Sequence, residues 1–173
     1  ILGIGGGVPS ASLRVAKKIR ARVIVTSGSN EKLERARDLG ADYGINHGSK
    51  DFVQEVQALT AGRGVDVLFD SIGGKFWRKS LASLAAGRRL VTCGATAEGE
   101  PIDDIAAICA KELKIYASTL GSREEFHQVI DFLSTAQIKP VIDSIFPLED
   151  AAGAQLHLEN ARQFGKIILQ IPD

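Results

Sequence analysis

The sequence predicts an α/β protein in which helices cover both faces of a doubly wound parallel sheet. Apolar, β-branched runs alternate with helical patterns along most of the 173 residues, which is typical of repeated strand–helix–strand units. A glycine cluster at 3–7 separates the first apolar run from the first helical pattern. Residues 65–70 are nearly all apolar, as in a central strand buried on both faces.

The first half of the chain is predicted to contain strands at residues 1–4, 22–26, 43–46 and 65–70. Apolar residues at helical spacing predict the helices between these strands. Their inner faces contain Leu13, Val15, Ala16 and Ile19, then Leu33, Ala36 and Leu39, then Phe52, Val56 and Leu59. Ser29 or Asn30 caps the second helix and Asp51 caps the third. Gly40 ends the second helix in a left-handed conformation.

The pattern continues to about residue 135. The fourth helix carries Trp77, Leu81 and Leu84 on its inner face and is expected to end at Gly87. Strands are expected at 89–93 and 113–119, with a loop at 94–101 and a short helix at 105–110 between them. Ser122 and Glu125 form a capping box ahead of the next helix. The apolar residues of that helix are Phe126, Val129, Ile130 and Leu133.

The last part of the chain has a different register. Strands are expected at 140–146 and 166–171, separated by an alanine-rich helix at 149–160. We therefore expect the sheet domain to span residues 1–138, and residues 139–173 to form a C-terminal segment that packs on something else.

Composition excludes several classes of protein. With 21 Lys and Arg against 21 Asp and Glu, the formal charge is zero, which disfavours binding to nucleic acid or to an anionic membrane surface. No apolar run approaches the roughly 18 residues that span a bilayer. The chain contains no methionine, so we expect it to be part of a longer protein.

The cysteines and histidines do not form a recognisable metal or disulfide pattern. Cys93 and Cys109 are far apart and lack a Cys-x-x-Cys spacing, so reduced thiols and a cytoplasmic location are expected. Cys93 is predicted to be a small buried apolar residue rather than a nucleophile. His47, His127 and His157 are isolated in sequence, so no zinc site is indicated.

The glycine cluster Gly3-Ile4-Gly5-Gly6-Gly7-Val8-Pro9 lies between a strand and a helix. In that context glycines permit a tight turn, and the amides at the helix N-terminus point at a diphosphate. No Gly-Lys-Ser/Thr ending follows, which excludes a triphosphate-binding P-loop. Pro9 stands where a last glycine is usual, but a proline in the first helical turn loses no hydrogen bond.

The end of the second strand indicates NADP rather than NAD. An NAD site is expected to have a carboxylate there for the ribose 2′-hydroxyl, but this strand ends Val25-Thr26-Ser27-Gly28-Ser29. Ser27, Ser29 and Lys32 suit a 2′-phosphate instead. The alternative is that the two serines only cap a helix and that Lys32 is a solvated surface charge.

The ordered series GIGGGV, ARVIVTSGSNEKLERARDLGAD, GIN, GRGVDVLFDSIGG and GRRLVTCGAT resembles the cofactor domain of medium-chain dehydrogenase/reductases, especially the quinone-oxidoreductase-like branch. The resemblance covers essentially the whole chain, including Phe146-Pro147-Leu148 and Phe164-Gly165-Lys166, which resemble the return segment into the catalytic domain. It implies a Rossmann-type fold and a GroES-like catalytic domain that lies outside this chain.

The resemblance also implies a set of cofactor contacts. Gly6, Gly7 and Val8 would lie against the pyrophosphate, and Ser27, Ser29 and Lys32 would take the 2′-phosphate. The adenosine half would be bordered by Ser71, Ile72 and Gly73, and the nicotinamide end by Cys93, Gly94, Ala95, Thr96, Thr119, Leu120 and Gly121. Pro9 and His47, where the family often has a tyrosine beside the cofactor, depart from the family pattern.

The expected function is therefore cofactor binding within an NADP-dependent oxidoreductase that transfers hydride to or from a carbonyl or an activated alkene. Its catalytic residues would lie outside this chain. The alternatives are a non-catalytic domain that senses NADP(H) and a methyltransferase; the missing carboxylate after the second strand disfavours the latter. The strand at 113–119 is expected at a sheet edge, which predicts a homodimer formed through that edge.

Overall fold

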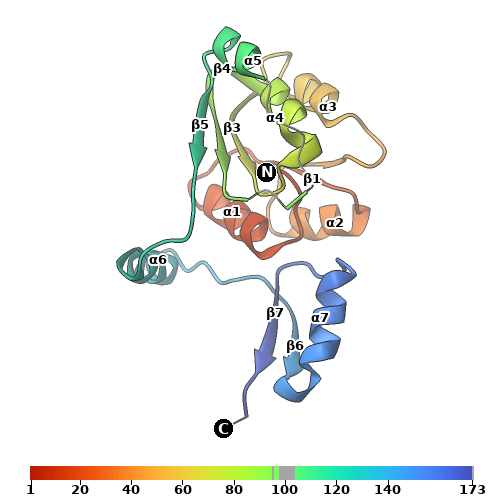
Figure 1. Ribbon diagram of the computed structural model, residues 1–173, viewed down its shortest axis with the longest axis vertical. Helices are drawn as coiled ribbons and strands as arrows, with labels where there is room; N and C mark the ends of the chain where they lie inside the picture. The colour runs from red at the N-terminus through yellow and green to blue at the C-terminus, as the bar shows by residue number, and fades with distance from the viewer. Residues whose placement is uncertain (95, 98–103, 173) are drawn as a thin grey trace.

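The structure is a computed structural model that describes every residue except 95, 98–103 and 173 (Figure 1). Its helices and strands alternate as the sequence predicts. In chain order they are α1 Gly7–Lys18, β1 Ile24–Ser27, α2 Asn30–Asp38, β2 Tyr43–Asn46, α3 Phe52–Leu59, β3 Val65–Asp70, α4 Trp77–Ser83, β4 Leu84–Thr92, α5 Ile105–Ala110, β5 Lys114–Ala117, α6 Arg123–Thr135, β6 Ile142–Pro147, α7 Ala151–Glu159 and β7 Lys166–Gln170. Short 3-10 turns at Gly74–Phe76 and Leu148–Asp150 precede α4 and α7.

The main sheet is parallel and doubly wound, which confirms the predicted fold class. β1 pairs with β2, and β3, β4 and β5 pair in that order. Residues 1–4 join the two groups through backbone hydrogen bonds from Leu2 N to Phe69 O (3.0 Å) and from Ile4 N to Thr26 O (2.7 Å). The predicted first strand is thus too short to form a regular strand, but it lies between β1 and β3 and continues the sheet.

Helices pack on the sheet through the apolar faces that the sequence predicts. Leu13 of α1 and Leu33 of α2 lie in one buried cluster, and Phe52 of α3 lies in a second. The predicted caps are also present: the Ser29 side chain accepts from Lys32 N, and the Asp51 side chain accepts from Val53 N and Gln54 N.

Two expectations about helix ends are wrong. Ile19 is 70% exposed, because α1 ends at Lys18 and the chain turns at Arg20 with a positive φ. The fourth helix does not reach Gly87: it ends at Ser83, and Leu84 already pairs with Val65 as the first residue of β4. Burial of Leu84 is compatible with either element, so apolar spacing alone did not locate this boundary.

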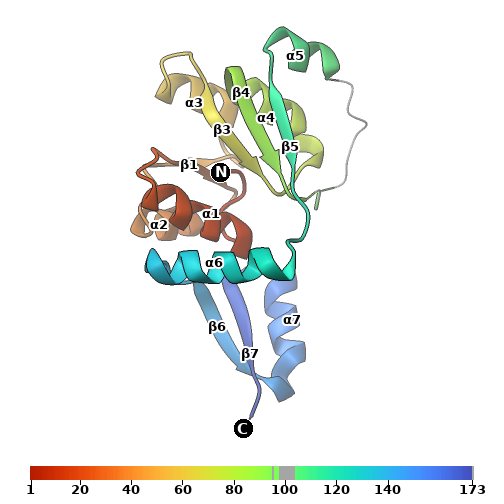
Figure 2. The ribbon, with the colours of Figure 1, turned by 90° about the vertical axis from the view of Figure 1, so that its left-hand side faces the viewer.

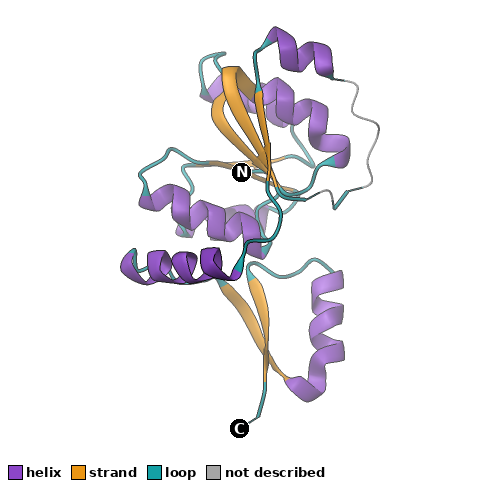
Figure 3. Cartoon of the chain, turned by 60° about the vertical axis from the view of Figure 1, so that its left-hand side comes forward, coloured by secondary structure: helices purple, strands orange, loops and turns teal. Residues whose placement is uncertain are grey.

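Beyond β5, the chain leaves the main sheet. The capping box of Ser122 and Glu125 starts α6 as predicted, but the apolar side chains of this helix are largely exposed. β6 and β7 pair only with each other among the described strands, and α7 packs on them. Figures 2 and 3 show this C-terminal pair apart from the main sheet, and Figure 1 shows α6 to one side of both. We call residues 140–172 the C-terminal unit.

One buried carboxylate joins the C-terminal unit to the main domain. Asp143 of β6 accepts hydrogen bonds from Phe164 N (2.7 Å), Arg35 of α2 (3.1 Å) and His157 of α7 (2.9 Å). Burial raises the pKa of Asp143, but the hydrogen bonds from Phe164, His157 and Arg35 outweigh it and hold the pKa at about 2. The side chain of Phe164, which is 1% exposed, belongs to the same buried cluster as Leu13.

This network predicts a loss of stability in acid. The pKa of Asp143 is lower in the folded chain than the unfolded value of 3.8, so its contribution is present above pH 4 and is lost as the pH falls through about 2. The contribution is about 2 kcal/mol at neutral pH. Urea unfolding of the wild type and of Asp143→Asn should show that difference at pH 7 and a much smaller one near pH 2.5. A constant difference across this range, or the same result with the exposed Asp131→Asn, would contradict the assignment.

Candidate functional site

Loops gather at the carboxyl ends of the parallel strands, and the glycine turn is at their centre. Gly3 and Gly5 have φ values of +67° and +137°, which side-chain-bearing residues rarely adopt. The turn leads into the 12-residue helix α1, whose N-cap Gly6 makes no side-chain capping bond. The first turn of α1 contains no acidic side chain. Its amides and the positive end of the helix dipole are therefore suited to an anion.

Two lysines lie over this turn. Lys32 Nζ donates to Ala161 O at 2.6 Å and is 3.2 Å from the position that a Cβ on Gly5 would take. Lys166 Nζ is 3.1 Å from the corresponding position on Gly7. Each lysine thus fills space that only a glycine leaves free. Ammonium groups beside a helix N-terminus suit phosphate groups, so the turn fits the anionic part of a dinucleotide.

Lys166 is a candidate that the sequence did not reveal. Phe164-Gly165-Lys166 was interpreted as a return segment, without a role at the glycine turn. The order of residues gives no sign that residue 166 contacts residue 7, because this contact depends on the packing of the C-terminal unit. The one signal in the sequence is the basic residue directly after a glycine, Gly165-Lys166.

The serines at the end of β1 serve as local caps in this structure. Ser27 Oγ accepts from Ser29 N at 3.2 Å, and Ser29 Oγ accepts from Lys32 N at 3.3 Å. Lys32 is not a freely solvated charge, since burial lowers its pKa and its ammonium lies against Gly5. No carboxylate follows β1 at residues 27–29, as the sequence shows.

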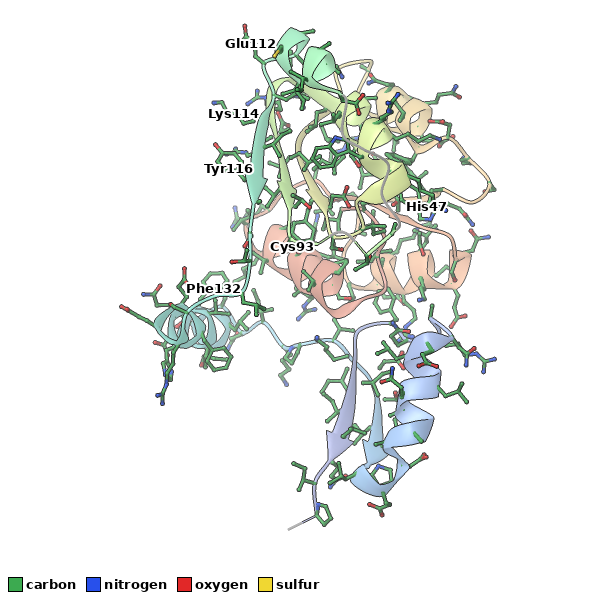
Figure 4. All side chains as sticks on the ribbon, viewed as in Figure 1. His47, Cys93, Glu112, Lys114, Tyr116 and Phe132 are labelled. Atoms are coloured by element: carbon green, nitrogen blue, oxygen red, sulfur yellow. The ribbon has the colours of Figure 1, made fainter. Side chains whose placement is uncertain are left out.

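His47 follows the last residue of β2 and lies beside the end of β1 (Figure 4). Its Nδ1 is 3.3 Å from Thr26 Oγ1, and its ring is 5.1 Å from that of Phe76. Burial, followed by the positive charge of Lys75, lowers the pKa of His47. The imidazole is therefore harder to protonate than a free histidine side chain.

The loop after β3 is held against the glycine turn by a buried acid. Asp70 is fully buried and accepts from Ile72 N (2.8 Å) and Gly73 N (2.9 Å). A Cβ on Gly3 would collide with the Ile72 side chain. The loop of Ser71, Ile72 and Gly73 thus lies against the glycine turn, and its assignment to the adenosine half stays a prediction.

The loop after β4 lies next to residue 71. Thr96 Oγ1 donates to Ser71 O at 3.4 Å, and Gly94 packs closely on the same carbonyl, whereas Ala95 lies outside the described residues. The expectation that Cys93 is buried is wrong: it is exposed, because it follows the last residue of β4 and leaves the sheet. Partial burial, with the nearby charge of Asp70, raises the pKa of its thiol.

Residues after β5 are the least supported part of the predicted site. Thr119, Leu120 and Gly121 are all exposed, and Leu120 is 98% exposed. They lead from the sheet to α6, and their assignment to the nicotinamide end stays a prediction.

The comparisons with known proteins agree with this geometry. Residues 7–135 match the family model described as zinc-binding dehydrogenase. The chain belongs to this family. It is 32% identical to an NAD-dependent alcohol dehydrogenase of Sulfolobus acidocaldarius over 99% of its length and 49% of that protein. It is 31% identical to a rat (Rattus norvegicus) quinone oxidoreductase, with 96% of the chain and 52% of the relative covered.

Solved structures of family members have the same fold. A crystal structure of an NAD-dependent alcohol dehydrogenase superposes with a TM-score of 0.90 at 36% identity, covering 99% of this chain and 50% of that one. The Escherichia coli quinone oxidoreductase complexed with NADPH gives 0.81 at 26% identity, with coverages of 96% and 55%. The chain spans about half the length of the relatives it matches. These matches confirm the resemblance to medium-chain dehydrogenase/reductases.

The family description implies zinc, so we examined the possible ligands. Within residues 1–94, 96–97 and 104–172, no three His, Cys, Asp or Glu side chains lie close enough together to hold a metal ion. The described residues therefore do not fit a zinc site, and no step below depends on zinc. In the same residues, no helix combines the length and the apolar character that crossing a membrane requires.

Proposed function

We propose that this chain is the cofactor-binding part of an NADP-dependent oxidoreductase. The observation that carries the proposal is the glycine turn, where Lys32 lies against Gly5 and Lys166 lies against Gly7 at the N-terminus of α1. Relatives named as alcohol dehydrogenase, quinone oxidoreductase and 2-haloacrylate reductase support an NAD(P)-dependent redox reaction.

The proposed reaction transfers hydride between the nicotinamide and a carbonyl or an activated alkene of a small molecule. The cofactor, when bound, supplies the hydride chemistry. The residues of this chain bind and orient it: the turn and Lys166 hold the diphosphate, Lys32 takes the 2′-phosphate, and the loop at 71–73 borders the adenosine half. The acid or base that moves the substrate proton is assigned to the rest of the protein.

Preference for NADP rests on the end of β1. The hydroxyls of Ser27 and Ser29 and the ammonium of Lys32 lie near this turn, and no carboxylate opposes a 2′-phosphate. Lys32 donates to a backbone carbonyl in this structure and would exchange that partner for the phosphate.

The cofactor assignment predicts a selective effect of Lys32→Ala. We expect NADPH to bind about tenfold more weakly, because a charge-assisted hydrogen bond worth about 1.4 kcal/mol is lost, while NADH binding changes less than about threefold. Fluorescence titration of both cofactors measures the effect, with Lys18→Ala at the other end of α1 as the matched control. Equal losses for both cofactors would show that Lys32 contacts the diphosphate and not the 2′-phosphate. If the wild type bound neither cofactor, the proposed function would be wrong.

A non-catalytic sensor of NADP(H) is the competing function, because the same site serves both. The whole protein decides between them when assayed for NADPH oxidation with quinones and enones. Turnover would exclude a pure sensor.

The exposed apolar faces of the chain are proposed to contact the rest of the protein. Phe126, Val129 and Ile130 of α6 are 60%, 50% and 46% exposed, and Ile145 of β6 is 61% exposed. Such faces are usually covered in a stable assembly. The part of the relatives that this chain does not match is long enough to supply the cover.

The free edge of β5 is proposed to pair with a second copy of the chain. β5 hydrogen-bonds only to β4 among the described strands, and Lys114 to Ala117 are all exposed (Figure 4). Sedimentation at high micromolar concentration should show a dimer for the wild type and a monomer for Ile115→Lys, since an inserted charge blocks edge pairing. The exposed Lys50→Ala serves as a control. A wild-type monomer would contradict the proposal.

A further inference from the structure

The carboxylate of Asp143 is a junction between three elements that are distant in sequence. Its Oδ1 accepts from Phe164 N and from Arg35 of α2, and its Oδ2 accepts from His157 of α7. The Arg35 guanidinium also lies 4.7 Å from the centre of the Phe164 ring. With only 9% of its side chain exposed, Asp143 is a nearly buried charge that is fully paired. Such a group holds its donors in place, because moving any of them leaves a nearly buried charge with fewer partners.

The residues that Asp143 holds continue directly to the glycine turn. Gly165 N donates to Gly5 O at 2.9 Å, and Lys166 N donates to Val141 O at 2.8 Å. Gly165 has a φ of +114°, and a Cβ there would collide with the carbonyl of Val141. Segment 164–166 is therefore bonded at each residue: to Asp143, to the glycine turn and to the residue that precedes β6.

These backbone hydrogen bonds also restrict where the ammonium of Lys166 can lie. A lysine side chain loses conformational freedom when it is immobilised, so an anchored backbone favours a fixed position for its charge. Lys166 packs on Gly7, the first residue of α1, where the helix amides are directed to an anion. The charges of Asp143 and Arg35 act directly on Lys32, whereas the effect of Asp143 on Lys166 passes through segment 164–166.

We propose that Asp143 is a positioning residue for diphosphate binding: by holding Phe164 N, it keeps Lys166 at the start of α1. This inference rests on the proposed cofactor function and extends it to a residue that does not touch the cofactor. His157 and Arg35 support the carboxylate from either side, so the C-terminal unit contributes to a site built mainly by the first part of the chain.

A double-mutant cycle on the 173-residue chain tests the proposal, with ADP-ribose as the probe because it has the diphosphate but no 2′-phosphate. We expect Asp143→Ala and Lys166→Ala each to weaken binding of ADP-ribose about tenfold. The double variant should also bind about tenfold more weakly than the wild type, and not a hundredfold, because both substitutions act through one contact. Asp143→Asn should recover part of the loss, since its amide oxygen still accepts from Phe164 N. Glu149→Gln and Lys18→Ala are the matched controls and should bind as the wild type does.

Amide hydrogen exchange, measured without ligand, shows whether a loss of binding comes from a loss of folding. In Asp143→Ala, which removes the acceptor of Phe164 N, exchange should speed up at Gly165 and remain unchanged in β3 and β4. A hundredfold loss in the double variant, or unchanged exchange at Gly165, would overturn the role of Asp143 while leaving cofactor binding intact. If the wild type bound no ADP-ribose, the proposed function would fall, and this inference with it.

Discussion

Gly7→Asp is expected to abolish cofactor binding without weakening the fold. Gly7 has an ordinary helical conformation at the first position of α1, and the atoms that a Cβ would meet belong to the flexible end of Lys166. An acidic side chain at this end of a helix stabilises it by about 0.3–1 kcal/mol. The new carboxylate would pair with Lys166 and occupy the position assigned to the diphosphate. Because like charges then meet at the centre of the site, NADPH and NADH should both bind more than about a hundredfold more weakly.

The isosteric variant Gly7→Asn separates charge from size. It displaces Lys166 in the same way but carries no negative charge, so we expect a loss of only about fivefold to tenfold for both cofactors. Thermal unfolding should show a midpoint for Gly7→Asp at or slightly above that of the wild type. If Gly7→Asp bound either cofactor as well as Gly7→Asn does, the anion would not lie at the start of α1.

Local signals in the sequence predicted the fold correctly because each acts over a few residues. Ser29, Asp51 and the pair Ser122 and Glu125 cap helices within one turn, and the alternation of apolar runs requires a parallel sheet. Errors arose where two elements compete for one residue. Leu84 is buried whether it ends a helix or begins a strand, and its pairing with Val65 decides the outcome.

The sequence predicted only those parts of the site that lie in single loops after strands. The glycine turn and the loop at 71–73 follow strands, so their place at one sheet edge follows from the topology. Lys166 lies at the site because it contacts Gly7, and Asp143 is linked to it because it contacts Arg35. Each contact joins residues that are more than a hundred positions apart in the chain. No local pattern records such contacts.

Gly28→Asp is expected to shift the cofactor preference strongly from NADPH toward NADH. Gly28 is exposed in the turn after β1, and a Cβ there would lie 3.6 Å from His47 Nε2, an ordinary contact distance. The substitution places a carboxylate where NAD-binding domains usually have one. It would repel a 2′-phosphate and accept hydrogen bonds from a ribose hydroxyl. NADPH should therefore bind about a hundredfold more weakly, while NADH binds equally well or a few-fold more tightly.

The measurement is best made at pH 8, because the lowered pKa of His47 leaves its ring neutral there, and it cannot cancel the new charge by forming an ion pair. Gly28→Asn provides the same volume without charge and should change NADPH binding less than about threefold. Added salt should narrow the difference between the two variants, since screening weakens repulsion between exposed charges. Equal losses of NADPH and NADH in Gly28→Asp would mean that this turn borders the cofactor without contacting its 2′ position, and the preference for NADP would then lose its structural basis.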